Sequence, residues 1–268
     1  MIWCKCFIGG RFTMWQKFLG LFKGLKKEEP SIVYEELYHK NACKMYEGEM
    51  MGAQFHGQGK CYDENEDLLY EGEFAYDLPH GTGTYYFSND ESYVGQFKKG
   101  ERTGYGKYYW SDGERYEGYF QNGKKDGKGK HYQANGDIYE GTFVDNVMQG
   151  KGSGFYANGE RYEGDFVDGK ETGFGILYLA DGGYYEGEVV DCIPHGKGQY
   201  KWESGRTYRG SFENGAMTGK GKMTYEDGSK YIGEFKDAKR HGEGVYQDIE
   251  GNQYEGVFED DAMIKRNA

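Results

Sequence analysis

The tripeptide Tyr-x-Gly recurs along the chain at an almost constant interval. Eleven residues after each of the first nine of its tyrosines comes a Gly-x-Gly. A fixed period of this length is typical of an array in which each repeat is one small supersecondary unit. We number ten repeats in chain order and count the positions of each repeat from its tyrosine. The tyrosines are spaced by 24 residues once and by 23 thereafter: Tyr46, Tyr70, Tyr93, Tyr116, Tyr139, Tyr162, Tyr185, Tyr208, Tyr231 and Tyr254.

Within each repeat, aromatic and polar residues alternate. Position 1 is Tyr, position 3 is Gly and position 5 is usually Phe, while positions 16 and 18 are largely aromatic, as in Tyr108 and Trp110. Such alternation predicts two β-strands per repeat. Asn-Gly and Asp-Gly pairs near position 20, such as Asn135-Gly136, are strong hairpin signals. We expect turns there, a variable loop near positions 6–11, and a second strand that opens with the Gly-x-Gly.

The Gly-x-Gly glycines are expected to serve geometry rather than phosphate binding. A glycine in a strand leaves a bare patch against which a neighbouring ring can lie. A phosphate-binding loop would require Gly-x-x-x-x-Gly-Lys-Ser/Thr or Gly-x-Gly-x-x-Gly leading into a helix. Residues 123–130 have neither spacing, and a strand-like stretch follows. We therefore expect no nucleotide site and no cofactor.

The net charge of −12 is unevenly distributed. Residues 1–27 contain six basic residues and no acidic one, which leaves −18 for the rest of the chain. The acidic body would repel nucleic acid, so we expect no nucleic-acid partner, whereas the basic N-terminus would attract anionic surfaces. An aromatic content of 18% argues against a disordered chain.

The cysteines and the apolar segments indicate in which cellular compartment the protein is found. The five cysteines form no Cys-x-x-Cys pair, and the N-terminus lacks the pattern of a secretory signal. No apolar run reaches 18 residues, so we expect no membrane-spanning helix. These features predict a cytoplasmic protein, with peripheral membrane or cytoskeletal and ciliary association as further possibilities.

The pattern Tyr-x-Gly-x-Phe followed by Gly-x-Gly resembles the MORN (membrane occupation and recognition nexus) repeat over residues 46–258. The resemblance implies an all-β fold, an elongated single-layer antiparallel sheet of consecutive β-hairpins twisted into an open trough lined by aromatic residues. It also implies a non-catalytic scaffold that dimerises and, in some members, holds a helical peptide in the trough. Met50 and Val189 depart from the pattern at position 5.

From this resemblance we expect a protein partner that contributes a helical segment, a basic amphipathic helix being one form. Residues on the expected aromatic face are the candidate partner-binding residues: Tyr70, Phe74, Tyr93, Phe97, Tyr108, Trp110, Tyr116, Phe120, Tyr139, Phe143, Tyr162, Phe166, Tyr200 and Trp202.

Four segments follow from the repeat boundaries. Residues 1–30 form a basic amphipathic segment, and residues 31–45 are a linker or a degenerate capping half-repeat. Residues 46–258 form the array of ten repeats, the last one partial, and residues 259–268 form a C-terminal tail. Because only a short acidic tail would shield the strand at 254–258, we expect a homodimer to form at that edge.

The opposite face of the array offers two alternatives. Position 17 is aromatic in repeats one to six, either as a good strand former on a solvated face or as a second binding surface. Position 2 is mostly Glu. This acidic stripe either keeps the protein soluble or attracts a basic amphipathic helix to the array. The position-17 residues are Tyr62, Tyr86, Tyr109, Tyr132, Phe155 and Tyr178.

No pattern of catalytic or metal-binding residues is evident. Four histidines occupy position 11 of separate repeats, which is typical of turn residues rather than of a metal site: His56, His80, His195 and His241. No Ser/His/Asp grouping or Cys/His ligand set stands outside the repeat. We expect a protein that is not an enzyme.

Residues 12–27 break the repeat and have helical spacing of apolar side chains. Aromatic residues on one face and lysines off it are what an interfacial helix requires. The candidate membrane-contact residues are Trp15, Lys17, Phe18, Phe22, Lys23, Lys26 and Lys27, with Cys4 and Cys6 as possible acylation sites. The alternative is that this helix docks on an aromatic face of the array. The corresponding alternative function for the chain is a phospholipid-binding membrane-association module.

Overall fold

The structure is a computed structural model that describes residues 31–40 and 42–267. These residues form 21 β-strands and no helix, and the chain divides into two parts, residues 1–124 and 125–268. The first part contains β1 (Ile32–Tyr38), β2 (Lys44–Met51), β3 (Gln54–Tyr62), β4 (Leu68–Ala75), β5 (Leu78–Tyr86), β6 (Ser92–Lys98), β7 (Glu101–Tyr109) and β8 (Arg115–Gln121). The second contains β9 (Lys124–Tyr132), β10 (Ile138–Val144), β11 (Val147–Phe155), β12 (Arg161–Val167), β13 (Lys170–Tyr178), β14 (Tyr184–Val190), β15 (Ile193–Lys201), β16 (Thr207–Glu213), β17 (Ala216–Thr224), β18 (Lys230–Lys236), β19 (Lys239–Gln247), β20 (Gln253–Glu259) and β21 (Ala262–Arg266).

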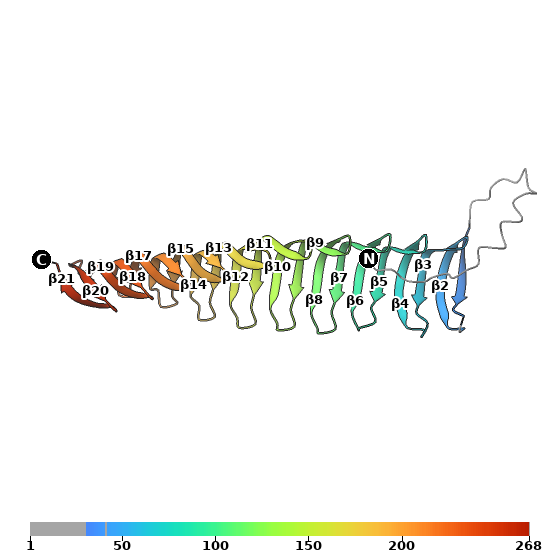
Figure 1. Cartoon of the computed structure of the whole chain (residues 1–268), viewed down its shortest axis with the longest axis horizontal. Helices are drawn as coiled ribbons and strands as arrows, with labels where there is room; N and C mark the ends of the chain where they lie inside the picture. Colours follow the sequence, from blue (N-terminus) through green and yellow to red (C-terminus); the bar gives the residue numbers. More distant parts are fainter. Residues whose placement is uncertain (1–30, 41, 268) are drawn as a thin grey trace, which may run out of the picture. The chain divides into compact units, whose positions relative to one another are not determined.

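Within each part, every strand pairs antiparallel with the strands next to it in sequence (Figure 1). The predicted all-β fold of consecutive hairpins is thereby confirmed. The register aligns the glycines of neighbouring strands: Gly210 faces Gly221 inside repeat eight, and Gly221 faces Gly233 of repeat nine. A row of glycines therefore crosses the sheet of each part.

The two strands of each repeat are joined by a turn of two residues. In repeat six, Asp168 (φ 52°) and Gly169 (φ 79°) both have left-handed backbone, which matches the twist of the flanking strands. The expectation of a variable loop near positions 6–11 is therefore wrong. Consecutive repeats are joined by five-residue loops, such as 133–137, where Gly136 has φ 94°.

The second strand begins before the Gly-x-Gly and not at it. Strand β13 starts at Lys170, while the first glycine of the pair is Gly173. The register shifts between Gly164 and Phe166, and Gly173 has φ +123°. A bulge at this position lets the strand continue through the glycines.

One further strand pairs with the repeats at each end of the array, and these two strands are the edges of the sheet. Strand β1 pairs with β2, and β21 pairs with β20, which places β21 at the C-terminal edge in place of residues 254–258. The predicted N-terminal helix, the membrane-contact residues Trp15 to Lys27 and the cysteines Cys4 and Cys6 lie outside the described residues. In the part of the chain that the structure describes, no helix is long and apolar enough to cross a membrane.

Candidate partner-binding surface

The position-1 tyrosine of most repeats lies over the glycine at position 14 of the same repeat. In repeat six, a Cβ atom on Gly175 would come within 2.5 Å of Cζ of Tyr162. The hydroxyl of Tyr162 donates a hydrogen bond to the carbonyl oxygen of Asp165 at 3.0 Å. The ring thus occupies the patch that the glycine leaves bare, as the sequence predicted. The same hydroxyl bond is made by Tyr46, Tyr70, Tyr93, Tyr116, Tyr185, Tyr208 and Tyr231.

These tyrosines and the position-5 phenylalanines form a ladder of edge-to-face contacts. The ring of Tyr208 lies 5.2 Å from Phe212 of its own repeat and 4.9 Å from Phe235 of the next, measured between centroids. Such contacts add stability beyond the area that they bury. We call the face that bears this ladder the packed face.

The structure places most of the predicted partner-binding residues inside the packed face. Ten are buried: Tyr70, Phe74, Tyr93, Phe97, Tyr108, Tyr116, Phe120, Phe143, Tyr162 and Phe166. Four are half-buried and retain accessible ring surface: Trp110, Tyr139, Tyr200 and Trp202. In this arrangement, the buried rings hold the sheet together, and three of the four half-buried candidates stand at positions 16 and 18.

In the first part, four rings form a continuous run, the Trp110 cluster, in which Tyr85 and Tyr108 are buried and Phe87 and Trp110 are half-buried. Centroid distances are 4.7 Å from Tyr85 to Phe87, 5.5 Å from Phe87 to Tyr108 and 4.5 Å from Tyr108 to Trp110. The guanidinium of Arg102 lies 4.9 Å from the centroid of Tyr108. Burial is the main cause that raises the pKa of Tyr108 to about 12, and its hydroxyl donates to the Glu91 carboxylate. The cluster therefore combines tilted ring contacts, a cation and the hydroxyl of a buried tyrosine.

In the second part, a smaller group has the same character, and we call it the Trp202 cluster. The rings of Tyr200 and Trp202 are 4.3 Å apart, and the guanidinium of Arg206 stands 3.8 Å from the centroid of Trp202. Trp, Tyr and Arg are the residue types most often found at the energetic centres of protein interfaces.

Repeat five departs from the pattern. The terminal methyl group of Met148 occupies the space over Gly141 and Gly152 that a tyrosine fills elsewhere. Tyr139 is displaced and lies 6.3 Å from Tyr156 between centroids. Gly154 stands at position 16, where other repeats have a larger side chain, and so leaves room for this arrangement.

Tyr156 brings two further groups together. Its hydroxyl donates to Glu171 Oε1 at 2.8 Å and lies 3.4 Å from Sγ of Cys192. Burial raises the pKa of Tyr156 and of the Cys192 thiol. A thiol kept protonated by burial is a poor nucleophile, so this group is a packing feature.

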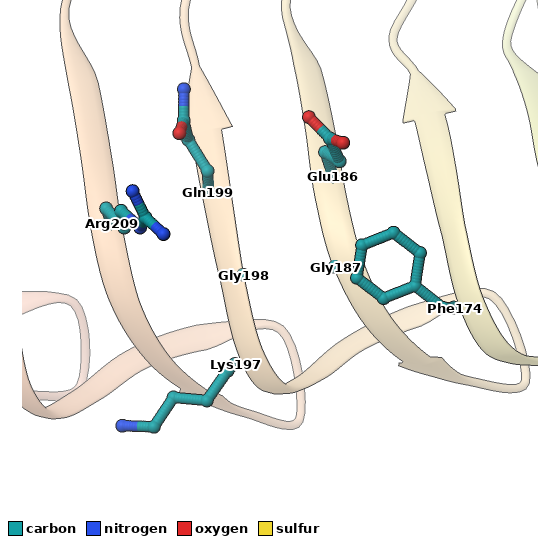
Figure 2. A pocket seen from close by; sticks show the side chains of 7 residues that line it. All are labelled: Phe174, Glu186, Gly187, Lys197, Gly198, Gln199 and Arg209. Atoms are coloured by element: carbon teal, nitrogen blue, oxygen red, sulfur yellow. The ribbon is translucent and has the colours of Figure 1, made fainter.

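The opposite face, which we call the second face, carries positions 2, 4, 13 and 15. Lysines at position 15 form ion pairs with glutamates at position 2 of the next repeat, as in Lys107–Glu117 at 3.3 Å. Hollows lie over the glycine row of this face. In one of about 320 Å³, Glu186, Gln199 and Arg209 project on one side of the Gly187–Gly198 pair and Lys197 on the other (Figure 2).

Side chains at position 4 have a role that the sequence reasoning missed. The Glu73 carboxylate accepts hydrogen bonds from the Thr82 backbone N–H at 2.8 Å and its hydroxyl at 2.9 Å. These bonds lower the pKa of Glu73. Asp165 and Glu188 accept from the equivalent N–H groups of Phe174 and Lys197. An acid or amide at position 4 therefore caps the bulge, and its recurrence three residues after the Tyr was the available signal.

The position-17 tyrosines take a modest structural role. The Tyr62 and Tyr86 hydroxyls donate to Glu47 and Glu71 of the position-2 row, at 2.8 and 3.0 Å. Among the described residues, no group of three or more His, Cys, Asp or Glu side chains could hold a metal ion.

The fold and its buried Tyr–Gly pairs define a class, namely an open antiparallel sheet built from a repeated hairpin. The MORN repeat family model matches nine consecutive segments, and the chain belongs to the MORN repeat family. The segments are residues 46–67, 70–92, 93–115, 116–138, 139–161, 162–184, 185–205, 208–230 and 231–253. No curated protein sequence matches the chain.

Solved structures with some similarity include two centriole-protein domains. One is the TCP10 domain of Danio rerio CPAP, with 10% identity over 84% of this chain and 98% of that chain and a TM-score of 0.41. Another is the TCP domain of Drosophila melanogaster SAS-4 in complex with a proline-rich motif of Ana2, with 12% identity over 58% of this chain and 85% of that chain and a TM-score of 0.38. Neither similarity bears on the function of this chain.

Proposed function

We propose that this MORN-repeat array is a non-catalytic scaffold that binds a helical segment of a protein partner through its accessible aromatic clusters. The observation that carries the proposal is the Trp110 cluster, in which four contacting rings end in a half-buried tryptophan. An aromatic anchor of this kind buries a large area at a low entropic cost when a partner covers it. The net charge of −18 on residues 28–268 would favour a partner with basic residues.

Comparative affinity capture tests this function. Full-length protein and the double variant Trp110→Ala, Trp202→Ala would be used as baits in the same cell extract, with Tyr119→Ala as the control. Tyr119 is half exposed, but it lies on the second face. We expect the same proteins to be lost from the double variant and retained by the control. Equal capture by all three baits would contradict the proposal.

We also propose that the N-terminal segment tethers the scaffold to an anionic membrane, with docking on an aromatic face of the array as the alternative. The support is the sequence of residues 12–27, in which aromatic residues alternate with lysines at helical spacing. Direct phospholipid binding by the array is the second candidate, and the −18 charge of the body disfavours it.

We also propose that the chain forms a homodimer through β21 and not through residues 254–258. An edge strand presents unpaired backbone groups that another chain can extend, and β21 is the strand at the C-terminal edge. Ile264 in this strand is exposed. Light scattering on the full chain and on a chain that ends at Glu259 tests this. Association through β21 predicts a dimer mass that falls to the monomer mass, and an unchanged mass contradicts it.

A further inference from the structure

Repeat eight interrupts the pairing of opposite charges on the second face. In the three other repeats that have a lysine at position 15, this lysine pairs with the position-2 glutamate of the next repeat, as in Lys60–Glu71 at 3.5 Å and Lys130–Glu140 at 3.4 Å. Position 2 of repeat eight is Arg209, and the register sets it directly opposite Lys222. Like charges directly opposite each other in an antiparallel pair are destabilising.

The next strands supply no acid to compensate for these cations. Gln199 stands opposite Arg209 on β15, and Ile232 stands opposite Lys222 on β18. Within the described residues, neither cation takes part in an ion pair. Both side chains are exposed to solvent. The chain therefore keeps two facing cations with no acid directly opposite either of them on the neighbouring strands.

A third cation and a groove complete the arrangement. Lys220 stands at position 13 of the same repeat, opposite Glu234. Arg209, Lys220 and Lys222 line one end of a groove of about 530 Å³ whose floor is the backbone of the glycine row. Glu234, Glu243 and Glu255 line the same groove from β18, β19 and β20. The groove thus has a cationic end and an acidic end over a floor without side chains.

We propose that Arg209, Lys220 and Lys222 bind the carboxylates of an acidic peptide segment that lies in this groove. Charge-assisted hydrogen bonds from an arginine and two lysines suit carboxylate oxygens. A narrow peptide can place its acids over the three cations alone, and a basic residue of the same segment would meet Glu243. A flat anionic bilayer would also meet Glu243 and Glu255 and the acidic body. The inference rests on the proposed function only in taking the ligand to be protein.

Binding of a labelled hexaglutamate peptide to the full chain at low ionic strength, followed by fluorescence anisotropy, tests the site. Because residues 28–268 are net negative, non-specific attraction to the array would not produce binding, and any binding to the basic residues 1–27 would be the same in wild type and variants. We expect saturable binding that weakens about tenfold or more in Arg209→Glu and in Lys220→Glu, since each removes a charge-assisted contact. The matched control is Lys128→Glu, the same change at position 13 of repeat four, and its affinity should stay within about twofold of the wild type.

A stability measurement separates loss of the ligand from loss of the fold. Arg209→Glu replaces the like-charge pair across β16 and β17 with an opposite-charge pair, so its thermal midpoint should equal or exceed that of the wild type. Absence of saturable binding by the wild type, or equal weakening in Lys128→Glu, overturns the proposal. Arg209-dependent flotation with phosphatidylserine vesicles, without hexaglutamate binding, overturns it in favour of a lipid surface. The Trp110 and Trp202 variants should retain hexaglutamate binding, which distinguishes this site from the proposed aromatic contact.

Discussion

The ring of Tyr185 fills the space that a side chain on Gly198 would need. A Cβ atom on Gly198 would lie 2.5 Å from Cζ of Tyr185. The Tyr185 hydroxyl donates to the carbonyl oxygens of Glu188 and His195 at 2.7 and 3.1 Å. The tyrosine and the glycine are therefore one packing element, because neither can change without displacing the other.

Gly187 stands directly opposite Gly198 on the neighbouring strand, and the stability of the fold should be sensitive to a single methyl group added there. A Cβ on Gly187 would lie 2.5 Å from Cα of Gly198 and 2.6 Å from the Lys197 carbonyl oxygen, and these backbone atoms cannot move alone. We expect Gly187→Ala to lower the free energy of unfolding by about 1–3 kcal/mol, as overpacking typically does. Chemical denaturation would measure the loss.

Gly141→Ala is the matched control, at the same position of repeat five. Its closest neighbour is the flexible end of Met148, and the nearest backbone atoms are 3.2 Å away. The loss should be smaller, below about 1 kcal/mol. Equal losses for the two variants would show that the close approach of backbone atoms at Gly187 does not set the cost.

Alkaline pH should unfold the array through its buried tyrosines. Burial raises the pKa of Tyr93, Tyr185 and Tyr208 from 10.0 to about 12. Their unfolded forms ionise near pH 10, so the stabilisation is complete below that pH and is lost as the pH rises toward 12. Tyrosinate absorbance and circular dichroism, recorded together, should change in the same interval. Ionisation of all 27 tyrosines before any loss of β-structure would contradict this.

Acid should release the cap that Glu73 places on its bulge. The Thr82 hydrogen bonds hold the pKa of Glu73 below its ordinary 4.5, so their contribution is present above that value and is lost as the pH falls through the lowered pKa. Amide exchange of Thr82, corrected for its intrinsic rate, should accelerate over this range. In Glu73→Ala the exchange should be fast at every pH, and a protected Thr82 amide in that variant would exclude the carboxylate as its cap.

Liposome flotation tests the membrane proposal for the N-terminal segment. Full-length protein should float with vesicles that contain anionic lipid, and the protein without residues 1–30 should not, because the remaining body carries a net negative charge. High salt should weaken the flotation of the full chain. Equal flotation of both proteins would show that residues 1–30 are not the membrane anchor.

The sequence predicted the hairpins and the pairing of rings with bare glycines because both recur with the 23-residue period. It misplaced the start of the second strand, since a register shift at a left-handed glycine such as Gly173 leaves no alternation to detect. The two-residue turns had a signal in Asp168-Gly169 and Asn214-Gly215, but the Asn-Gly pairs of the longer loops drew the hairpin assignment instead.

The candidate site was less predictable than the fold. Alternation places Tyr116 and Trp110 on the same face, yet it does not tell that the tyrosine is fully covered and the tryptophan half accessible. That difference depends on which ring lies over a glycine pair and which stands at the loop end of a strand. The exchange of Tyr139 for Met148 over the repeat-five glycines likewise depends on side-chain volumes that single positions do not reveal.

The two-residue turns link each repeat to the one before it. The Gly169 N–H donates to the Met148 carbonyl oxygen at 3.0 Å, and the Gly215 N–H donates to that of Pro194 at 2.9 Å. A newly made hairpin thus finds its acceptor on a segment that has already left the ribosome. Synthesis from the N-terminus supplies these acceptors in order, so such an array can assemble one hairpin at a time during translation.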